Sequence, residues 1–511
     1  MNSKNEAAYE QLKDRLATIS DLSSARLLLF WDQQTYMPQG AAKGRAEQEA
    51  TLSQLSHEML VSKETGRLLG SAGEPDPSSD EGALIRRVRR DYERAAKIPA
   101  DLVARTSRVT CMAEAAWPQA RKESNWSLFA PHLAEVIALK REAAEFWGYE
   151  DHPYEALLGA YEPGASKAQL EVMFEELKRG IVPLIRSVAE QSREDENRAA
   201  PLYGEFDEGR QEEFGRAVIL AFGYDWRRGR QDRSVHPFCI RTGPDDVRMT
   251  TRFDGTRLSP ALFGTMHEAG HALYTQGVNP AYARTPLDGG TSSGVHESQA
   301  RLWENLVGRS RPFWSRYYPK LREAFPEAFK GVDVEAFYRA INAVSPSKNR
   351  IEADEVTYNL HILLRFELEV AMIEGTLSVA DLPAAWNAKM EEYLGIIPEN
   401  NSEGVLQDMH WSGGVFGHFP SYAIGNVLSV QLFDEVIEAH PEIPEQIREG
   451  EFSTLLGWLR EKVHRHGCRY YPDELIQSAT GSPLDTAPYL SYLNKKFGEL
   501  YEPRLREGVF S

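Results

Sequence analysis

The 511-residue chain is poor in cysteine and has fewer basic than acidic residues. Its three cysteines, Cys111, Cys239 and Cys468, are too few for a disulfide framework, so a disulfide-bonded secreted scaffold is excluded and a reducing compartment is expected. Lys and Arg number 58 against 76 Asp and Glu, which gives a formal net charge of −18. Because nucleic acids and anionic membranes attract basic surfaces, this charge argues against either partner.

Long apolar runs are also missing. The apolar stretch at residues 25–31 is far shorter than the roughly 20 residues of a membrane-spanning helix, and it predicts a buried helix instead. Residues 1–6 are polar and contain no apolar signal segment, so we expect a cytoplasmic protein. The 42% of hydrophobic residues suffice for a large core.

The segment His267-Glu268-Ala269-Gly270-His271 matches the H-E-x-x-H pattern. On a helix, positions i and i+4 share one face, so His267 and His271 can present two imidazole nitrogens to one metal ion. Glu268 lies beside them, where its carboxylate can reach a metal-bound water. Gly270 would weaken a helix by about 1 kcal/mol relative to alanine, which favours close packing or a functional site here. The alternative is a pair of structural histidines on a buried helix.

A catalytic zinc ion needs a third protein ligand and one open position for water. One class of zinc peptidases takes that ligand from a histidine six residues after the second one, but here that position is Gly277. A carboxylate on a second helix is the other common solution, and residues 291–304 offer one. We predict Glu297 as the third ligand, with Glu304 and His296 as rival ligands.

These residues resemble the carboxypeptidase Taq family of zinc metallocarboxypeptidases, since the segment His296-Glu297-Ser298-Gln299 is similar to a second signature of that family. Further similar stretches follow in the expected order along nearly the whole chain: Trp31-Asp32-Gln33, Thr35-Tyr36-Met37-Pro38, His236-Pro237-Phe238, Asp246-Val247-Arg248-Met249-Thr250-Thr251, Ile351-Glu352-Ala353-Asp354 and Gly404-Val405-Leu406-Gln407-Asp408-Met409-His410-Trp411. One departure is His418, where members of the family often carry tyrosine.

The resemblance implies a mainly α-helical metallopeptidase with two lobes around a deep substrate cleft, similar to neurolysin and angiotensin-converting enzyme. β-type runs at residues 235–240 and 247–253 predict a small sheet beside the zinc helix, whose edge could line a substrate groove. The predicted organisation is one catalytic unit of two interleaved lobes over residues 1–511, with lid helices in 1–60, a β element at about 235–253 and zinc-binding helices at about 260–310.

Three zinc ligands leave a fourth position for a water whose pKa falls to about 7, and the ion also polarises a bound carbonyl. Glu268 would accept the proton of that water and then deliver a proton to the leaving amine. Tyr422 and His410 are candidate donors to the oxyanion that forms. For both of them, packing at a loop between helices is the alternative.

An enzyme that removes C-terminal residues must recognise a free carboxylate, and the guanidinium fork of arginine suits this task. By resemblance Arg350 is the first candidate, ahead of Arg248 and Lys348. A structural ion pair is the alternative for Arg350. His236 is a candidate for the wall of the groove, although a core histidine fits its sequence context as well.

Together these features predict a metallocarboxypeptidase that releases single C-terminal amino acids from peptides with broad specificity. The resemblance implies zinc or cobalt as the metal and a homodimer as the assembly. Two alternatives remain: an oligopeptidase that cuts internal bonds of short peptides, and a non-catalytic helical peptide-binding protein with a structural zinc. Glu268 weakens the second alternative, because a structural metal needs no carboxylate base.

Overall fold

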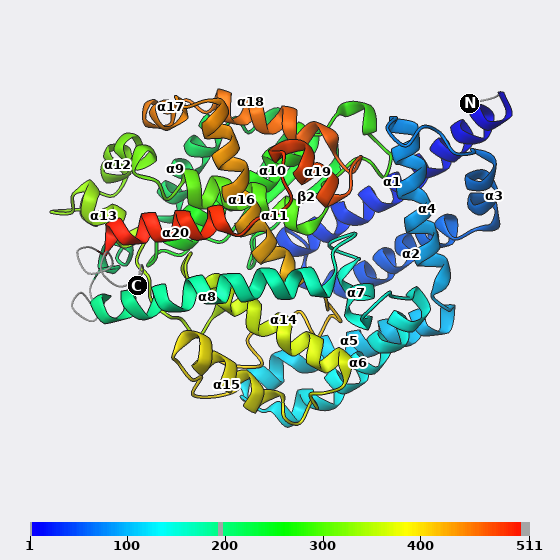
Figure 1. Ribbon diagram of the computed structural model, residues 1–511, viewed down its shortest axis with the longest axis horizontal. Helices are drawn as coiled ribbons and strands as arrows, with labels where there is room; N and C mark the ends of the chain where they lie inside the picture. Colours follow the sequence, from blue (N-terminus) through cyan, green and yellow to red (C-terminus); the bar gives the residue numbers. More distant parts are fainter. Residues whose placement is uncertain (1–2, 193–197, 502–511) are drawn as a thin grey trace.

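The computed structural model describes residues 3–192 and 198–501, and it is mainly helical, as predicted (Figure 1). The α-helices are α1 (Ser3–Thr35), α2 (Ala42–Leu60), α3 (Lys63–Ser71), α4 (Asp80–Lys97), α5 (Ala100–Lys122), α6 (Trp126–Trp147), α7 (Pro153–Leu158), α8 (Lys167–Ser192), α9 (Glu208–Phe222), α10 (Ser259–Gly277), α11 (Ser293–Arg301), α12 (Arg311–Ala324), α13 (Val334–Ile341), α14 (Tyr358–Glu374), α15 (Leu382–Leu394), α16 (Phe419–Ala439), α17 (Ile443–Glu449), α18 (Ser453–Lys462), α19 (Pro472–Thr480) and α20 (Ala487–Leu500). None of these described helices is long and apolar enough to cross a membrane.

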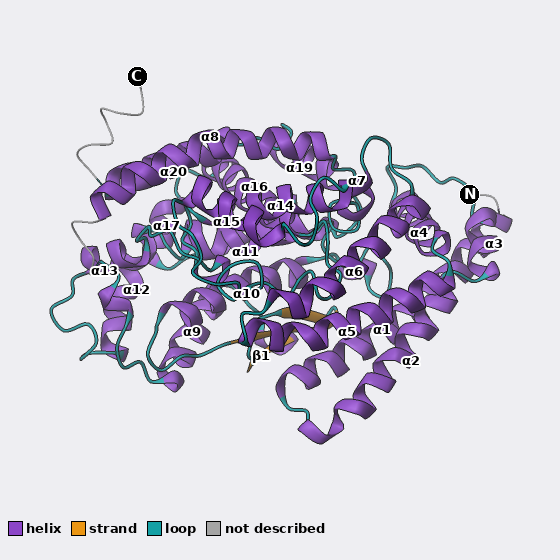
Figure 2. Cartoon of the chain, turned by 90° about the horizontal axis from the view of Figure 1, so that it is seen from below, coloured by secondary structure: helices purple, strands orange, loops and turns teal. Residues whose placement is uncertain are grey.

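A small mixed sheet accompanies the helices (Figure 2). Its strands are β1 (Gly229–Arg233), β2 (Cys239–Gly243) and β3 (Asp246–Thr251), in the order β1-β3-β2. β1 runs parallel to β3 and β2 runs antiparallel to it. The two later strands fall within the predicted β element, whereas β1 was not predicted. Its sequence is Gly-Arg-Gln-Asp-Arg, which lacks the apolar alternation that marks a strand.

Three helices form the centre of the molecule: α10, α11 and α16 (Figure 1). Buried residues follow one another along nearly all of α10 and α16, so these helices are enclosed on most sides. Ser292 caps α11, because its side chain accepts a hydrogen bond from the N–H of Val295. One large apolar core surrounds this centre and reaches from Leu102 to Tyr501.

The N-terminal helices have a smaller core of their own, in which Leu12 and Leu16 of α1 pack with residues of α3 and α4. α1 and α2 project beside the rest of the molecule (Figure 2). The end of α1 lies on the sheet, where the guanidinium of Arg248 stacks on the ring of Trp31 at 4.3 Å. The lid role of residues 1–60 and the division into two lobes remain predictions.

Glycine allows the central helices to approach one another. A methyl group at Gly270 of α10 would lie 2.6 Å from both Cα of Ala300 and the carbonyl oxygen of Gln299, which are backbone atoms of the α11 segment. Gly264 of the same helix has room for a methyl group, since its nearest neighbour, Cγ of Pro237, would lie at an ordinary contact distance of 4.0 Å. The glycine inside the H-E-x-x-H pattern is therefore required by helix packing.

We expect Gly270→Ala to destabilise the protein by about 1–3 kcal/mol, because α10 and α11 would have to separate. Thermal unfolding with and without added metal would measure the change. Gly264→Ala is the matched control: it should leave stability unchanged or raise it by up to about 1 kcal/mol, since alanine is the better helix former. Equal behaviour of the two variants would contradict the packing role of Gly270.

Candidate metal centre

The structure brings the three predicted metal ligands together. His267, His271 and Glu297 each offer one ligand atom, and these atoms lie within 4.8 Å of one another. The Nε2 atoms of His267 and His271 are 3.9 Å and 3.8 Å from Oε2 of Glu297. A tetrahedral zinc ion with bonds of about 2.0–2.1 Å would separate its ligands by roughly 3.4 Å. The three residues therefore fit one divalent metal after a small inward adjustment.

The outer nitrogens of both histidines are held by further side chains. Nδ1 of His267 lies 2.9 Å from Oε2 of Glu304, and Nδ1 of His271 lies 2.6 Å from Nδ1 of His296. A proton on each outer nitrogen leaves the Nε2 lone pairs directed at the metal position. Glu304 and His296, the two rival ligands, thus contact the ligands and are not members of the cluster.

Arg301 joins the two carboxylates of this region. Its Nε donates to Oε1 of Glu297 at 2.8 Å, and its Nη1 donates to Oε2 of Glu304 at 2.9 Å. This leaves Oε2 of Glu297 free for a metal. Burial opposes ionisation of Glu304, but Arg301 and His267 hold its pKa below the usual range. Glu304 therefore remains a carboxylate that can accept from His267.

A π-helical segment, Leu302–Val307, follows α11 directly and carries Glu304. π-helical turns are rare and occur often at functional sites. Along a helix, positions 297, 301 and 304 lie on one face, since they are spaced by four and three residues. α11 and the π-helical segment together therefore present Glu297, Arg301 and Glu304 toward α10.

The backbone of α16 lies directly against Glu297. A methyl group at Gly425 would lie 2.5 Å from Cγ of Glu297. The buried carboxylate of Glu162 connects the same two helices, because its Oε1 accepts from the N–H of Gly294 at 2.5 Å and from Oγ of Ser421 at 2.6 Å. Packing and hydrogen bonds therefore fix α11 against α16.

Glu268, the predicted base, is buried next to the cluster with 6% of its surface exposed. Burial raises its pKa to about 7. A bound cation would lower this value, because it favours the ionised carboxylate. The strand β2 begins near this residue: burial, and secondly the charge of Glu268, raises the pKa of the Cys239 thiol.

Tyr422 and His410 lie together on the α16 side of the site. Nε2 of His410 is 3.4 Å from the hydroxyl of Tyr422, and the His418 ring centroid is 5.0 Å from that of Tyr422. Tyr422 precedes Gly425 by one helical turn, so it lies on the face of α16 that packs on Glu297. Burial lowers the pKa of His410 to about 3, which keeps its imidazole neutral.

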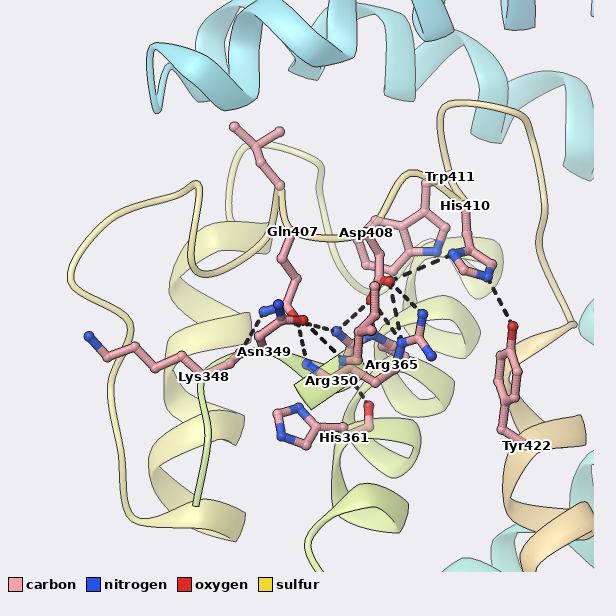
Figure 3. A network of polar contacts seen from close by, with 12 residues as sticks. Lys348, Asn349, Arg350, His361, Arg365, Gln407, Asp408, His410, Trp411 and Tyr422 are labelled. Atoms are coloured by element: carbon pink, nitrogen blue, oxygen red, sulfur yellow. Dashed lines mark hydrogen bonds and ion pairs between the residues drawn. The ribbon is translucent and has the colours of Figure 1, made fainter. Parts of the chain in front are cut away.

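Arg350 belongs to a buried ionic network (Figure 3). Its Nη2 donates to Asp408 at 2.8 Å, and Asp408 also accepts from Nε of Arg365 at 2.7 Å. Nη1 of Arg350 donates to the hydroxyl of Tyr358 at 3.1 Å, and its guanidinium lies 5.1 Å from the centre of the Tyr422 ring. Two guanidinium groups thus share one carboxylate, which leaves one positive charge in excess beside Tyr422.

The other candidates for substrate binding lie elsewhere. Arg248 forms a two-pronged pair with Asp246, with both distances at 2.8 Å, in addition to its contact with Trp31. His236 is exposed in the bend between β1 and β2. Lys348 pairs with Glu399 and Glu403. No described contact joins these three residues to the metal cluster.

Sequence analysis missed Arg301 and assigned no role to Asp408. A signal for Arg301 was present, because it follows Glu297 by four residues and precedes Glu304 by three. Asp408 stands within a stretch that resembles a family signature, but its two arginine partners lie 58 and 43 residues away. Nothing in the sequence shows that these three side chains meet.

A divalent metal held by two histidines of one helix and a glutamate of the next, with a carboxylate beside it, is the arrangement of a metallopeptidase. A model of the family described as Carboxypeptidase Taq (M32) metallopeptidase matches residues 11–497, and the chain belongs to this family. It is a metallocarboxypeptidase, a hydrolase of peptides.

Similar proteins cover nearly the whole chain. Carboxypeptidase 1 of Bacillus subtilis is 40% identical over 490 residues, which are 96% of this chain and 97% of that protein. Thermostable carboxypeptidase 1 of Thermus thermophilus is 40% identical over 509 residues, covering 97% and 99%. The crystal structure of an M32 carboxypeptidase from Deinococcus radiodurans superimposes with a TM-score of 0.93 at 42% identity, covering 97% of this chain and 99% of that one.

We expect Glu304→Gln to weaken metal binding by about 10- to 100-fold, because His267 loses the charged acceptor that orients its ring. Competition with a fluorescent chelator would measure the affinity. Glu352→Gln, which removes a carboxylate from the ion pair with Arg257 and has no described contact with the cluster, is the control and should bind metal normally. Unchanged affinity in Glu304→Gln would show that Glu304 does not support the ligand.

Proposed function

We propose that the enzyme is zinc-dependent and releases single C-terminal amino acids from peptides. One observation carries this proposal. The cluster of His267, His271 and Glu297 is linked to Arg350 by buried contacts through Arg301 and Tyr358, and the network of Arg350 holds an excess positive charge. Cobalt is the alternative metal, because nitrogen and oxygen ligands in this geometry accept both ions.

Zinc at this site would supply a water of lowered pKa and would polarise the scissile carbonyl. His267, His271 and Glu297 would hold the ion. Glu268 accepts a proton from the attacking water and transfers it to the nitrogen of the leaving amino acid. Burial raises the proton affinity of Glu268, because a poorly solvated carboxylate holds a proton more readily than one in water. The residue is therefore a better proton acceptor than an exposed glutamate.

Tyr422 and His410 act on the developing oxyanion. The phenol of Tyr422 can donate a hydrogen bond toward the metal position, since the residue lies on the face of α16 that packs on Glu297. His410 contacts the phenol oxygen at 3.4 Å and thereby orients it. His418, beside the same ring, fills a position where members of the family often carry tyrosine.

Arg350 binds the C-terminal carboxylate of the substrate. Arg365 is fully buried and satisfies Asp408 from one side, so Arg350 is the guanidinium of the pair that faces Tyr422. A substrate carboxylate would neutralise the excess charge of the network. The fully paired Arg248 and Lys348 are weaker candidates, and His236 is proposed only as part of the groove wall.

Product chemistry separates this function from its rivals. An oligopeptidase would give internal fragments, and a binding protein with structural zinc would give no products. The excess positive charge at Arg350 favours a carboxypeptidase, because an internal peptide bond presents no carboxylate for it to bind. Free amino acids released from an N-blocked dipeptide, and abolished by a chelator, would confirm the proposal.

The proposal also includes the cellular compartment and the oligomeric state of the enzyme. The cysteines Cys111, Cys239 and Cys468 are all free, which fits a reducing compartment such as the cytoplasm. A homodimer is the expected assembly, and peptides, not nucleic acids or membranes, are the expected partners. Analytical ultracentrifugation would establish the assembly.

We expect Glu268→Gln to keep its metal and to lose turnover by about a hundredfold or more, because the glutamine cannot accept the proton of water. His267→Ala should lose both metal and turnover, since one of three ligands is gone. Metal analysis and hydrolysis of the blocked dipeptide would be measured on the same samples. An active Glu268→Gln enzyme would remove Glu268 from the role of base.

We expect Arg350→Ala to lower kcat/KM on free-acid peptides by about a hundredfold, which corresponds to a lost charged hydrogen bond of 1.5–3 kcal/mol. C-terminally amidated peptides, which offer no carboxylate, should be affected little. Asp408 keeps Arg365, so the fold should survive. Lys348→Ala, which removes a cation near the same loop, is the control. Equal losses of kcat/KM on both peptide types in Arg350→Ala would show that Arg350 is not the anchor.

A further inference from the structure

The loop between α15 and α16, residues 395–418, contains no helix or strand. It carries Asp408, the partner of Arg350, and His410, the neighbour of Tyr422. Figure 3 shows both loop residues with these partners. Loops of this length in a compact protein are commonly functional, and they are positioned by the rigid elements around them. The placement of Arg350 relative to Tyr422 therefore depends on what holds this loop.

One face of α14 holds the loop at two places. Arg365 and Glu369 lie one helical turn apart on this face, and both side chains are fully buried. Arg365 donates to Asp408 at 2.7 Å, in the middle of the loop. Glu369 accepts from Nε1 of Trp411 at 2.8 Å and from the N–H of Gly417 at 3.0 Å, in its last part. A single helix thus fixes both ends of the segment between Asp408 and Gly417.

The carboxylate of Glu369 has no ion-pair partner among residues 3–192 and 198–501. It also accepts from the hydroxyl of Tyr154 at 2.8 Å, and Arg365 on the previous turn is paired with Asp408 instead. Burial raises the pKa of Glu369 to about 7, because a buried charge without a cation is costly. A carboxylate at this position is explained by its contacts, since only a group that carries no hydrogen on either oxygen accepts from all three donors.

The turn at Gly417 lies against the end of α7. Gly417 has a φ of +83°, and an added Cβ would lie 2.6 Å from the backbone nitrogen of Leu158, the last residue of that helix. The N–H of this turn therefore has a fixed position, and Glu369 is its acceptor. His418 follows directly, and its ring centroid lies 5.0 Å from that of Tyr422. The contact with Glu369 thus ends one residue before a side chain that packs on Tyr422.

We propose that Glu369 is a positioning residue for catalysis. By fixing residues 408–418, it sets the distance between Arg350 and Tyr422. This inference rests on the proposed function, in which Arg350 binds the substrate carboxylate and Tyr422 acts on the oxyanion. An error in their separation would leave the carboxylate bound but the scissile carbonyl misplaced. Glu369 acts through the loop, since none of its described contacts is with either residue.

Glu369→Gln tests this role because it replaces one oxygen by an NH₂ group. The indole N–H of Trp411 meets Oε1 of Glu369, and the N–H of Gly417 meets Oε2. Whichever way the new amide lies, its NH₂ group faces a loop N–H from which it cannot accept. We expect kcat/KM on free-acid peptides to fall about ten- to a hundredfold, mainly through kcat, because the misplacement persists at saturation. Metal affinity should be unchanged, since no metal ligand has moved.

A substitution of the donor separates the hydrogen bond from general damage. Trp411→Phe removes one of the two loop contacts, leaves the buried acid in place and should lower kcat/KM by about tenfold. This variant tests the contact even where Glu369→Gln does not fold. In the Trp411→Phe background, Glu369→Gln should cause little further loss, because the new NH₂ group no longer meets an indole N–H. Equal losses in both backgrounds would overturn the proposal, since independent effects multiply.

Glu367→Gln is the matched control on the same helix. Glu367 accepts from the hydroxyl of Tyr393 at 2.6 Å and pairs with Lys389, and none of its described contacts is with the loop. It faces another side of α14, because positions i and i+2 of a helix do not face each other. This variant should keep the kcat/KM of the unaltered enzyme. A loss equal to that of Glu369→Gln would show a general effect of α14 and would overturn the proposal.

Hydrogen exchange gives a readout that does not depend on turnover. In Glu369→Gln, residues 408–418 should exchange faster while α10 and α11 keep their protection, because only the loop is released. Unchanged exchange of the loop would overturn positioning as the mechanism.

The unaltered enzyme separates this inference from the proposed function. If it hydrolyses the blocked dipeptide in a chelator-sensitive reaction and Glu369→Gln does so equally well, the role of Glu369 alone is overturned. An unaltered enzyme that is loaded with metal and inactive would instead overturn the proposed function.

Discussion

The metal centre depends on an unusually close approach of α10, α11 and α16. Gly270 lets the backbone of α11 lie against the histidine helix, and Gly425 lets α16 lie against the side chain of Glu297. Gly294 does the same for Ile424, whose Cγ2 would lie 2.6 Å from an added methyl group. Larger side chains at these contacts would force the helices apart, and the carboxylate of Glu297 would no longer reach both histidines.

A second constraint joins the metal centre to Arg350, the proposed anchor of the substrate carboxylate. Arg301 holds Glu297 and Glu304, and its guanidinium stacks 4.4 Å from the centre of the Tyr358 ring. The hydroxyl of Tyr358 accepts from Arg350. The distance between the metal ligands and the anchor is therefore set by a continuous series of buried contacts. A fixed distance between the two groups suits an enzyme that cleaves the last peptide bond of its substrate.

Much of this arrangement follows from the sequence where the relevant residues are close along the chain. The two histidines and Glu268 are specified by helical periodicity, and Glu297 follows from the need for one more ligand on a neighbouring helix. The predicted family and the mainly helical fold are confirmed. β1 escaped prediction, because its residues are polar and it is a strand only through pairing with β3.

Contacts between distant segments could not be predicted. The partners of Asp408 come from α14 and from the turn at Arg350–Glu352, so single-sequence patterns contain no signal for their meeting. The same holds for His296, which was a rival metal ligand in the sequence and whose Nδ1 instead contacts His271. The roles of these residues depend on how the helices pack, since the residue types alone are compatible with several roles.

Glu162 gives the assembled site a further property. Its carboxylate joins Gly294, 132 residues later, to Ser421, 259 residues later. Contacts over such sequence separations form late in folding, because long loops must close before they contribute stability. The nascent chain therefore cannot complete its hydrolytic centre until most of it has been synthesised. A chain that ends before α16 would contain His267, His271 and Glu297 but would lack the helix that packs on Glu297.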